Sequence, residues 1–172
     1  FAERNLPETQ VAAVEIDPVV VSIADQYFNT KPNQKIRILT EDAFVYIKET
    51  NRQYDAIYMD AFLRPSIDNK EGSSTARLKT KQFILQIKSR LNSDGVLACN
   101  LIAHRKATSN DIAVLREVFQ SVETFSVPGT GNLVVIAGDK LEDRSRPEWD
   151  AIAAQLGSTI ELPFEDFINR IK

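Results

Sequence analysis

Cysteine and histidine are nearly absent from this sequence, in which each occurs once, as Cys99 and His104. A single cysteine excludes an internal disulfide framework and fits a reducing compartment, so we expect a cytoplasmic protein. One cysteine and one histidine give little support to a zinc site or a thiol protease, and no metal is expected. Cys99 lies inside an apolar run, which predicts a thiol packed in the core.

Long apolar runs and an excess of basic residues are also lacking. No stretch approaches the roughly 18–20 apolar residues of a membrane span, and the start carries no signal-peptide pattern. Acidic residues number 24 against 21 basic ones, and the net charge of −3 disfavours nucleic acid or an anionic membrane as a partner. The chain begins at Phe1 within a helix-like segment, so we expect its natural N-terminus to lie upstream.

What the sequence does contain is an alternation of short apolar runs with segments of helical period. The runs have the length of buried strands and lie at 11–16, 36–39, 54–60, 95–102, 122–127 and 132–138. Helices are expected at 18–28, after Asp42, at 83–91, from about 109, and near 149–156 and 164–171. A turn is expected at 92–95, and the polar stretch 63–79 has the length of a lid or binding loop.

This alternation predicts a single α/β domain, residues 1–172, with a mostly parallel sheet between layers of helices. Only residues 128–131 separate the last two strands, which is too short for a crossover, so this pair should be antiparallel. A terminal antiparallel hairpin distinguishes the Rossmann-like, three-layer fold of the S-adenosylmethionine-dependent methyltransferases from a plain dinucleotide-binding fold. The first strand of that fold, with its glycine-rich loop, is expected to precede Phe1.

Acidic residues follow three successive strands, where an open α/β sheet binds its ligand. Glu15 and Asp17 end the first strand, Asp42 follows the second, and Asp60 ends the third. A carboxylate here can accept both hydroxyls of a ribose, and one at a helix start can accept from an adenine amine. The alternatives are that Glu15 or Asp17 only caps the helix that opens at Pro18, that Asp42 is only a helix cap, and that Asp60 is a solvated loop acid.

Four blocks in this order resemble the spermidine/spermine synthase family: VEIDPVVVSIADQYF, RILTEDAFVYIKE, YDAIYMDAF and LKTKQFILQIKSRLNSDGVLACNL. By this resemblance Glu15 binds the ribose of S-adenosylmethionine, its decarboxylated form or methylthioadenosine, and Ile16 packs on the adenine. Asp17 belongs to the same nucleoside site, and Asp42 with Ala43 holds the adenine amino edge. Asp60 then deprotonates the attacking amine, which in this family is a polyamine. A homodimer is among the expected assemblies.

The sequence also departs from the family, and the departure leaves several functions open. Leu63 stands where the synthases typically carry a second acid, as in divergent synthase-like members. An aminopropyltransferase is the leading hypothesis, and an S-adenosylmethionine-dependent methyltransferase is the second. A non-catalytic, partner-binding descendant and a nicotinamide enzyme are the further alternatives.

Overall fold

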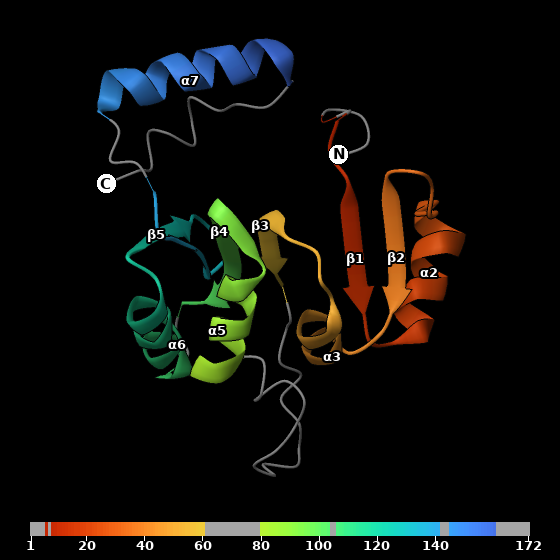
Figure 1. Ribbon diagram of the computed structural model, residues 1–172. Helices are drawn as coiled ribbons and strands as arrows, with labels where there is room; N and C mark the ends of the chain where they lie inside the picture. The colour runs from red at the N-terminus through yellow and green to blue at the C-terminus, as the bar shows by residue number, and fades with distance from the viewer. Residues whose placement is uncertain (1–5, 7, 61–79, 104–105, 142–144, 161–172) are drawn as a thin grey trace.

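A computed structural model of the chain describes residues 6, 8–60, 80–103, 106–141 and 145–160. The described part contains six strands and five helices, which alternate along most of the chain (Figure 1). The α/β class expected from the sequence is therefore confirmed. The expected loop at 63–79, the helix at 164–171, Leu63 and His104 lie outside the described residues.

The N-terminal part is a strand–helix–strand unit made of β1 (Val11–Glu15), α2 (Pro18–Phe28) and β2 (Ile36–Thr40). The two strands are parallel and pair in register, which requires the crossover that α2 supplies. Helix α2 begins where the sequence predicts, because Asp17 caps it and Pro18 occupies the first turn. Its C-cap is Asn29, whose N–H donates to Ala24 O and whose left-handed backbone (φ 51°) brings the Thr30 N–H to the same oxygen at 3.1 Å.

The second sheet has four strands in the order β3 (Tyr54–Met59), β4 (Leu91–Ile102), β6 (Asn132–Gly138) and β5 (Ser121–Val127). Strands β3 and β4 are parallel, whereas β4–β6 and β5–β6 are antiparallel. The β5–β6 pair confirms the expected hairpin, and its turn contains Gly129 and Gly131, whose positive φ angles of 77° and 71° suit glycine.

The remaining helices are α3 (Ala43–Glu49), α5 (Lys81–Ser89), α6 (Lys106–Val118) and α7 (Arg146–Thr159). Helices α5 and α6 pack side by side over one face of the four-stranded sheet, and α3 contacts both β1 and α5 (Figure 1). The hydroxyls of Tyr46 in α3 and Tyr54 in β3 are 2.6 Å apart, and burial, followed by this hydrogen bond, raises the pKa of Tyr54. None of the described helices combines the length and the apolar character of a membrane span.

The core lies between the four-stranded sheet and helices α5 and α6. Its most deeply buried side chains are Phe83, Ile87, Leu97, Val135 and Cys99. Cys99 is 1% exposed, so the expected packed thiol is confirmed. Each large apolar side chain buried here contributes roughly 1.5–3 kcal/mol. Helix α2 has no buried residue, and it exposes the apolar side chains Val19, Val20, Ile23, Tyr27 and Phe28.

Two features differ from the expectation. The strands form two sheets, because no described strand pairs with the remaining edges of β1 and β3. The turn expected at 92–95 is wrong, since these residues belong to β4. Pairing along β4 shifts between Tyr54↔Leu91 and Ala56↔Val96, so the polar residues 92–94 form an exposed irregularity inside the strand.

Candidate functional site at the carboxyl ends of the strands

The end of β1 presents two acidic side chains and one apolar side chain. Glu15 is half-buried, and its Oε1 accepts a hydrogen bond of 2.8 Å from the backbone N–H of Asp17. Asp17 Oδ1 accepts from Val19 N–H at 2.8 Å and so caps α2. Ile16 is 56% exposed between the two acids. The second oxygen of each carboxylate, Glu15 Oε2 and Asp17 Oδ2, takes no part in these two bonds.

The end of β2 lies directly beside the end of β1. Glu15 pairs with Thr40, and Glu41 N–H donates to Glu15 O at 3.0 Å. The next residue, Asp42, caps α3 by accepting from Phe44 N–H at 2.9 Å through Oδ1. Ala43 is the first residue of α3. The parallel register therefore brings the segment of Asp42 and Ala43 next to the strand end that carries Glu15.

Asp60 follows β3 in the other sheet. The last pair of the β3–β4 ladder is Met59↔Cys99, so the next residue on each strand is Asp60 and Asn100. Asn100 Nδ2 donates to Asp60 Oδ1 at 3.0 Å, and this holds one oxygen of an otherwise exposed carboxylate. Asn100 was not among the residues that the sequence indicated, although a polar residue in the apolar run of β4 is a signal that could have identified it.

The acids therefore occupy one end of the molecule but two different sheets. Glu15, Asp17 and Asp42 lie at the ends of β1 and β2, whereas Asp60 follows β3. These strand ends all point to the lower edge of the view in Figure 1, with α3 between them. This is the edge at which an open α/β sheet binds ligands.

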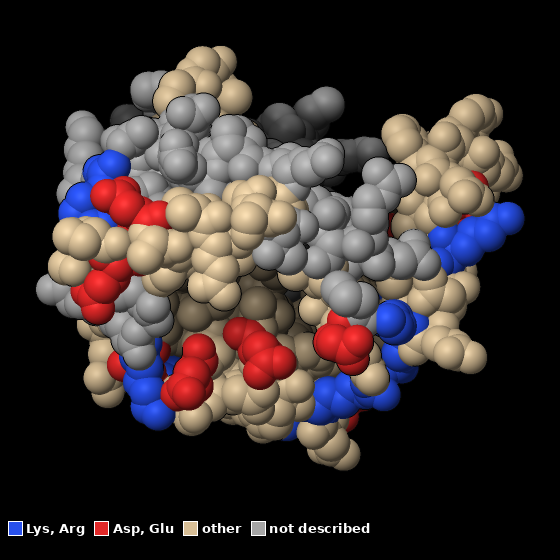
Figure 2. Space-filling view, turned by 90° about the horizontal axis from the view of Figure 1, so that it is seen from above, with Lys and Arg blue, Asp and Glu red and all other residues tan. Residues whose placement is uncertain are grey.

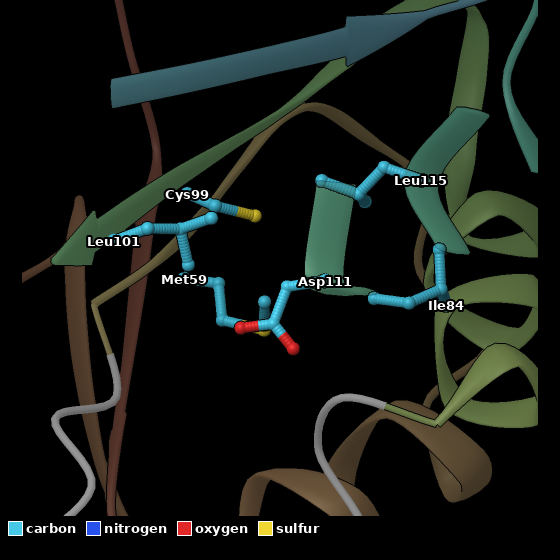
Figure 3. A pocket seen from close by; sticks show the side chains of 6 residues that line it. All are labelled: Met59, Ile84, Cys99, Leu101, Asp111 and Leu115. Carbon is cyan, nitrogen blue, oxygen red and sulfur yellow. The ribbon is translucent and has the colours of Figure 1, made fainter. Parts of the chain in front are cut away.

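A small hollow, partly open to solvent, lies next to the end of β3 and is lined by Met59, Ile84, Cys99, Leu101, Asp111 and Leu115. The Asp111 carboxylate from α6 points toward the Met59 side chain (Figure 3). Because alternate strand residues point to opposite faces, Asn100 faces away from the side of Cys99 and Leu101. This hollow is thus on the other face of the sheet from the Asp60–Asn100 pair.

On the face of the molecule opposite the strand ends, the described basic side chains are not gathered into one patch. On the side seen in Figure 2, which is opposite the strand ends just described, Lys and Arg lie in separate groups with Asp and Glu between them. Within the same described residues, no group of three or more histidine, cysteine, aspartate or glutamate side chains is arranged to hold a metal ion.

Comparison with known proteins gives a family match over most of the chain. A family model described as the spermine/spermidine synthase domain matches residues 5–136. A polyamine aminopropyltransferase from Vibrio vulnificus is 36% identical over 135 residues, which are 76% of this chain and 43% of that protein. An eEF1A lysine and N-terminal methyltransferase homolog from Drosophila pseudoobscura pseudoobscura is 24% identical over 175 residues, 96% of this chain and 25% of that protein.

Among solved structures, human methyltransferase-like protein 13 in complex with SAH has a TM-score of 0.81 and 24% sequence identity. The match covers 94% of this chain and 76% of that chain. This likeness shows that the two share a Rossmann-like methyltransferase fold. The chain spans less than half the length of the two curated relatives.

Proposed function

Because the chain belongs to the spermine/spermidine synthase family, we propose that it is a transferase that alkylates an amine from a nucleoside sulfonium. The sulfonium is S-adenosylmethionine or its decarboxylated form. The observation that carries this proposal is the register of β1 and β2, which joins Glu15 and Asp42 at one strand-end edge. Two carboxylates in that position suit the two ends of a nucleoside, the ribose and the adenine.

In this proposal the nucleoside lies along the ends of β1 and β2. Glu15 accepts from the ribose hydroxyls through Oε2, since its Oε1 is held by the Asp17 N–H. The exposed Ile16 packs against the adenine ring. Asp42 accepts from the adenine amino group through Oδ2, because Oδ1 caps α3, and the Ala43 backbone completes this edge. Asp17 supports the site by capping α2 beside Glu15.

The chemical step is a nucleophilic displacement at a carbon bonded to the sulfonium sulfur. The amine lone pair forms the new nitrogen–carbon bond while the carbon–sulfur bond breaks and leaves its electron pair on sulfur. Transfer of an aminopropyl group releases methylthioadenosine. The nitrogen loses a proton to Asp60, which is positioned for this role by its place after β3 and its bond to Asn100. Alignment and proton removal are the protein's main contributions, since a sulfonium is already a good leaving group.

A methyltransferase is the second candidate, and one observation favours it. The eEF1A methyltransferase homolog matches 96% of this chain at 24% identity, so the likeness to a methyltransferase extends over nearly the whole chain, as does the likeness to an aminopropyltransferase from Chromobacterium violaceum. The same nucleoside site and the same base serve both reactions. The products distinguish them, because methyl transfer releases S-adenosylhomocysteine, whereas aminopropyl transfer releases methylthioadenosine.

The experiment measures binding and turnover separately. Calorimetry with methylthioadenosine is expected to show a ten- to hundredfold loss of affinity in Glu15→Gln, the effect of weakening hydrogen bonds to a charged group. Glu123→Gln, an exposed acid on β5, is the control. Turnover is measured with putrescine plus decarboxylated S-adenosylmethionine, and with S-adenosylmethionine in a parallel assay.

Asp60→Asn should lower kcat by about 10²–10⁴-fold, the usual contribution of a general base. Asp55→Asn is the matched control, because Asp55 accepts from Asn92 Nδ2 at 2.6 Å near the opposite end of the same strand. Unchanged nucleoside affinity in Glu15→Gln would remove the proposed binding site. Full turnover in Asp60→Asn would remove the proposed base.

A further inference from the structure

Asn100 is a polar residue in the otherwise apolar carboxyl half of β4. Its neighbours Cys99 and Leu101 are 1% and 5% exposed and belong to the core. The Asn100 amide donates through Nδ2 to Asp60 Oδ1 at 3.0 Å. Its Oδ1 is buried and has no hydrogen-bond partner among the described residues. A buried acceptor without a partner destabilises the folded protein, so an explanation for this atom is required.

The orientation of the amide is fixed by its partner. If the amide turned over, Asn100 Oδ1 would face Asp60 Oδ1, and two acceptors at hydrogen-bond distance repel each other. The amide nitrogen must therefore face the carboxylate, and the amide oxygen must point elsewhere. The unpaired position of Oδ1 is a direct consequence of holding Asp60.

We propose that Asn100 is a positioning residue of the transfer reaction, one that holds Asp60 with its nitrogen and accepts an N–H of the incoming amine with its oxygen. This inference rests on the proposed function. A neutral primary amine has two N–H bonds and one lone pair in roughly tetrahedral directions. If one N–H donates to Asp60 Oδ2 and the other to Asn100 Oδ1, both acceptors are used and the lone pair is left for the sulfonium carbon. As the nitrogen–carbon bond forms, Asp60 Oδ2 takes the proton from the amine N–H that it accepts.

The opposite end of the same two strands carries a matched pair. Asn92 of β4 donates through Nδ2 to Asp55 Oδ1 of β3 at 2.6 Å. Both residues of this pair are exposed, and it lies at the end of the strands away from the site. The two asparagines thus make the same kind of bond, and only Asn100 has a buried oxygen and a strand-end position.

The test compares Asn100→Leu with Asn92→Leu in the whole protein, using turnover of putrescine with decarboxylated S-adenosylmethionine. Asn100→Leu should lower kcat by about 10–100-fold, part of the contribution of a general base, and leave methylthioadenosine affinity unchanged. Its melting temperature should be equal or higher, since leucine removes a buried unpaired acceptor from an apolar strand. Asn92→Leu should leave kcat unchanged. Asn100→Val is a second variant that preserves strand propensity if leucine is too large.

A double-mutant cycle shows whether Asn100 acts through Asp60. In the Asp60→Asn background, Asn100→Leu should lower kcat by no more than about twofold, because coupled residues are not additive. Wild-type kcat in both Asn100 variants, or equal losses in the presence and absence of Asp60, would overturn this inference alone. Wild-type turnover in Asp60→Asn would remove the proposed base and this inference with it, whereas no turnover of the wild type with either sulfonium would overturn the proposed function as well.

Discussion

Asp42 uses one carboxylate oxygen to cap α3, and the proposed nucleoside contact uses the other. A substitution can separate these two roles, because serine is as good an N-cap as aspartate but carries no charge. Asp42→Ser should therefore keep the wild-type free energy of unfolding and lose about tenfold or more in methylthioadenosine affinity. Asp42→Ala should lose the same affinity and also about 0.5–2 kcal/mol of stability. Wild-type affinity in a stable Asp42→Ser protein would show that Asp42 is only a cap; urea unfolding and calorimetry measure the two effects.

The sequence indicated the acidic residues at the strand ends, but it did not indicate Asn100, the residue that holds Asp60. Glu15, Asp17 and Asp42 could be placed because each follows an apolar run and precedes a helix start, which are local signals. The bond between Asn100 and Asp60 joins residues 40 positions apart. It depends on the β3–β4 register, and that register includes a shift between Tyr54 and Ala56 that no local pattern encodes.

Gly95 occupies a crowded backbone position in β4. A Cβ at this residue would lie 2.9 Å from Tyr54 O, 3.0 Å from Asn92 N and 3.1 Å from Asn92 O, and backbone atoms cannot move aside easily. Gly95→Ala should therefore reduce the free energy of unfolding by about 1–3 kcal/mol, the usual effect of overpacking. Gly157→Ala in α7 is the control, because its Cβ would meet no atom within 4 Å, and it should gain about 0.5–1 kcal/mol. Equal urea midpoints for the two variants would contradict this account.

The strands were predicted more accurately than the turn before Gly95. Apart from the start of β4, the strands start and end within one residue of the expected positions, because apolar runs and helix caps mark them. The turn at 92–95 was wrong, since asparagine, serine, aspartate and glycine indicate a turn equally well when they form an irregularity inside a strand. Tertiary pairing of Leu91 with Tyr54 decides between the two structures.

For the whole molecule, the alternation of runs predicted the α/β class and the short 128–131 gap predicted the hairpin. The division into two sheets was not predictable, because the pattern of a buried strand is the same whether one or both of its edges are paired. The position of β6 between β4 and β5 was not predictable either. The apolar sequence of β6 shows that the strand is buried, but it does not show which strands lie on its two sides.

An ion pair connects the ends of several elements on the side of the core away from the proposed site. Lys88 of α5 lies 2.6 Å from Asp139 Oδ2, just after β6, and also donates to Val118 O at the end of α6 at 2.8 Å. The Lys88 ammonium lies 5.4 Å from the centre of the Phe119 ring. Asp139 Oδ1 also accepts from Gln120 N–H at 3.1 Å. One half-buried carboxylate therefore joins α5, the α6–β5 connection and the end of β6.

Acid sensitivity of the whole fold follows from this carboxylate. The hydrogen bond from Lys88 lowers the pKa of Asp139 in the folded protein, so its stabilising effect is present above the unfolded pKa of about 3.9 and is lost as the pH falls toward the native value. Asp139→Asn should lose roughly 1.5–3 kcal/mol of stability at neutral pH, and this deficit should narrow between about pH 5 and about pH 2. Asp94→Asn, which breaks an exposed pair with Lys140, should change stability little at neutral pH. A deficit in Asp139→Asn that stays constant down to about pH 2 in urea unfolding would mean that the carboxylate charge is not its source.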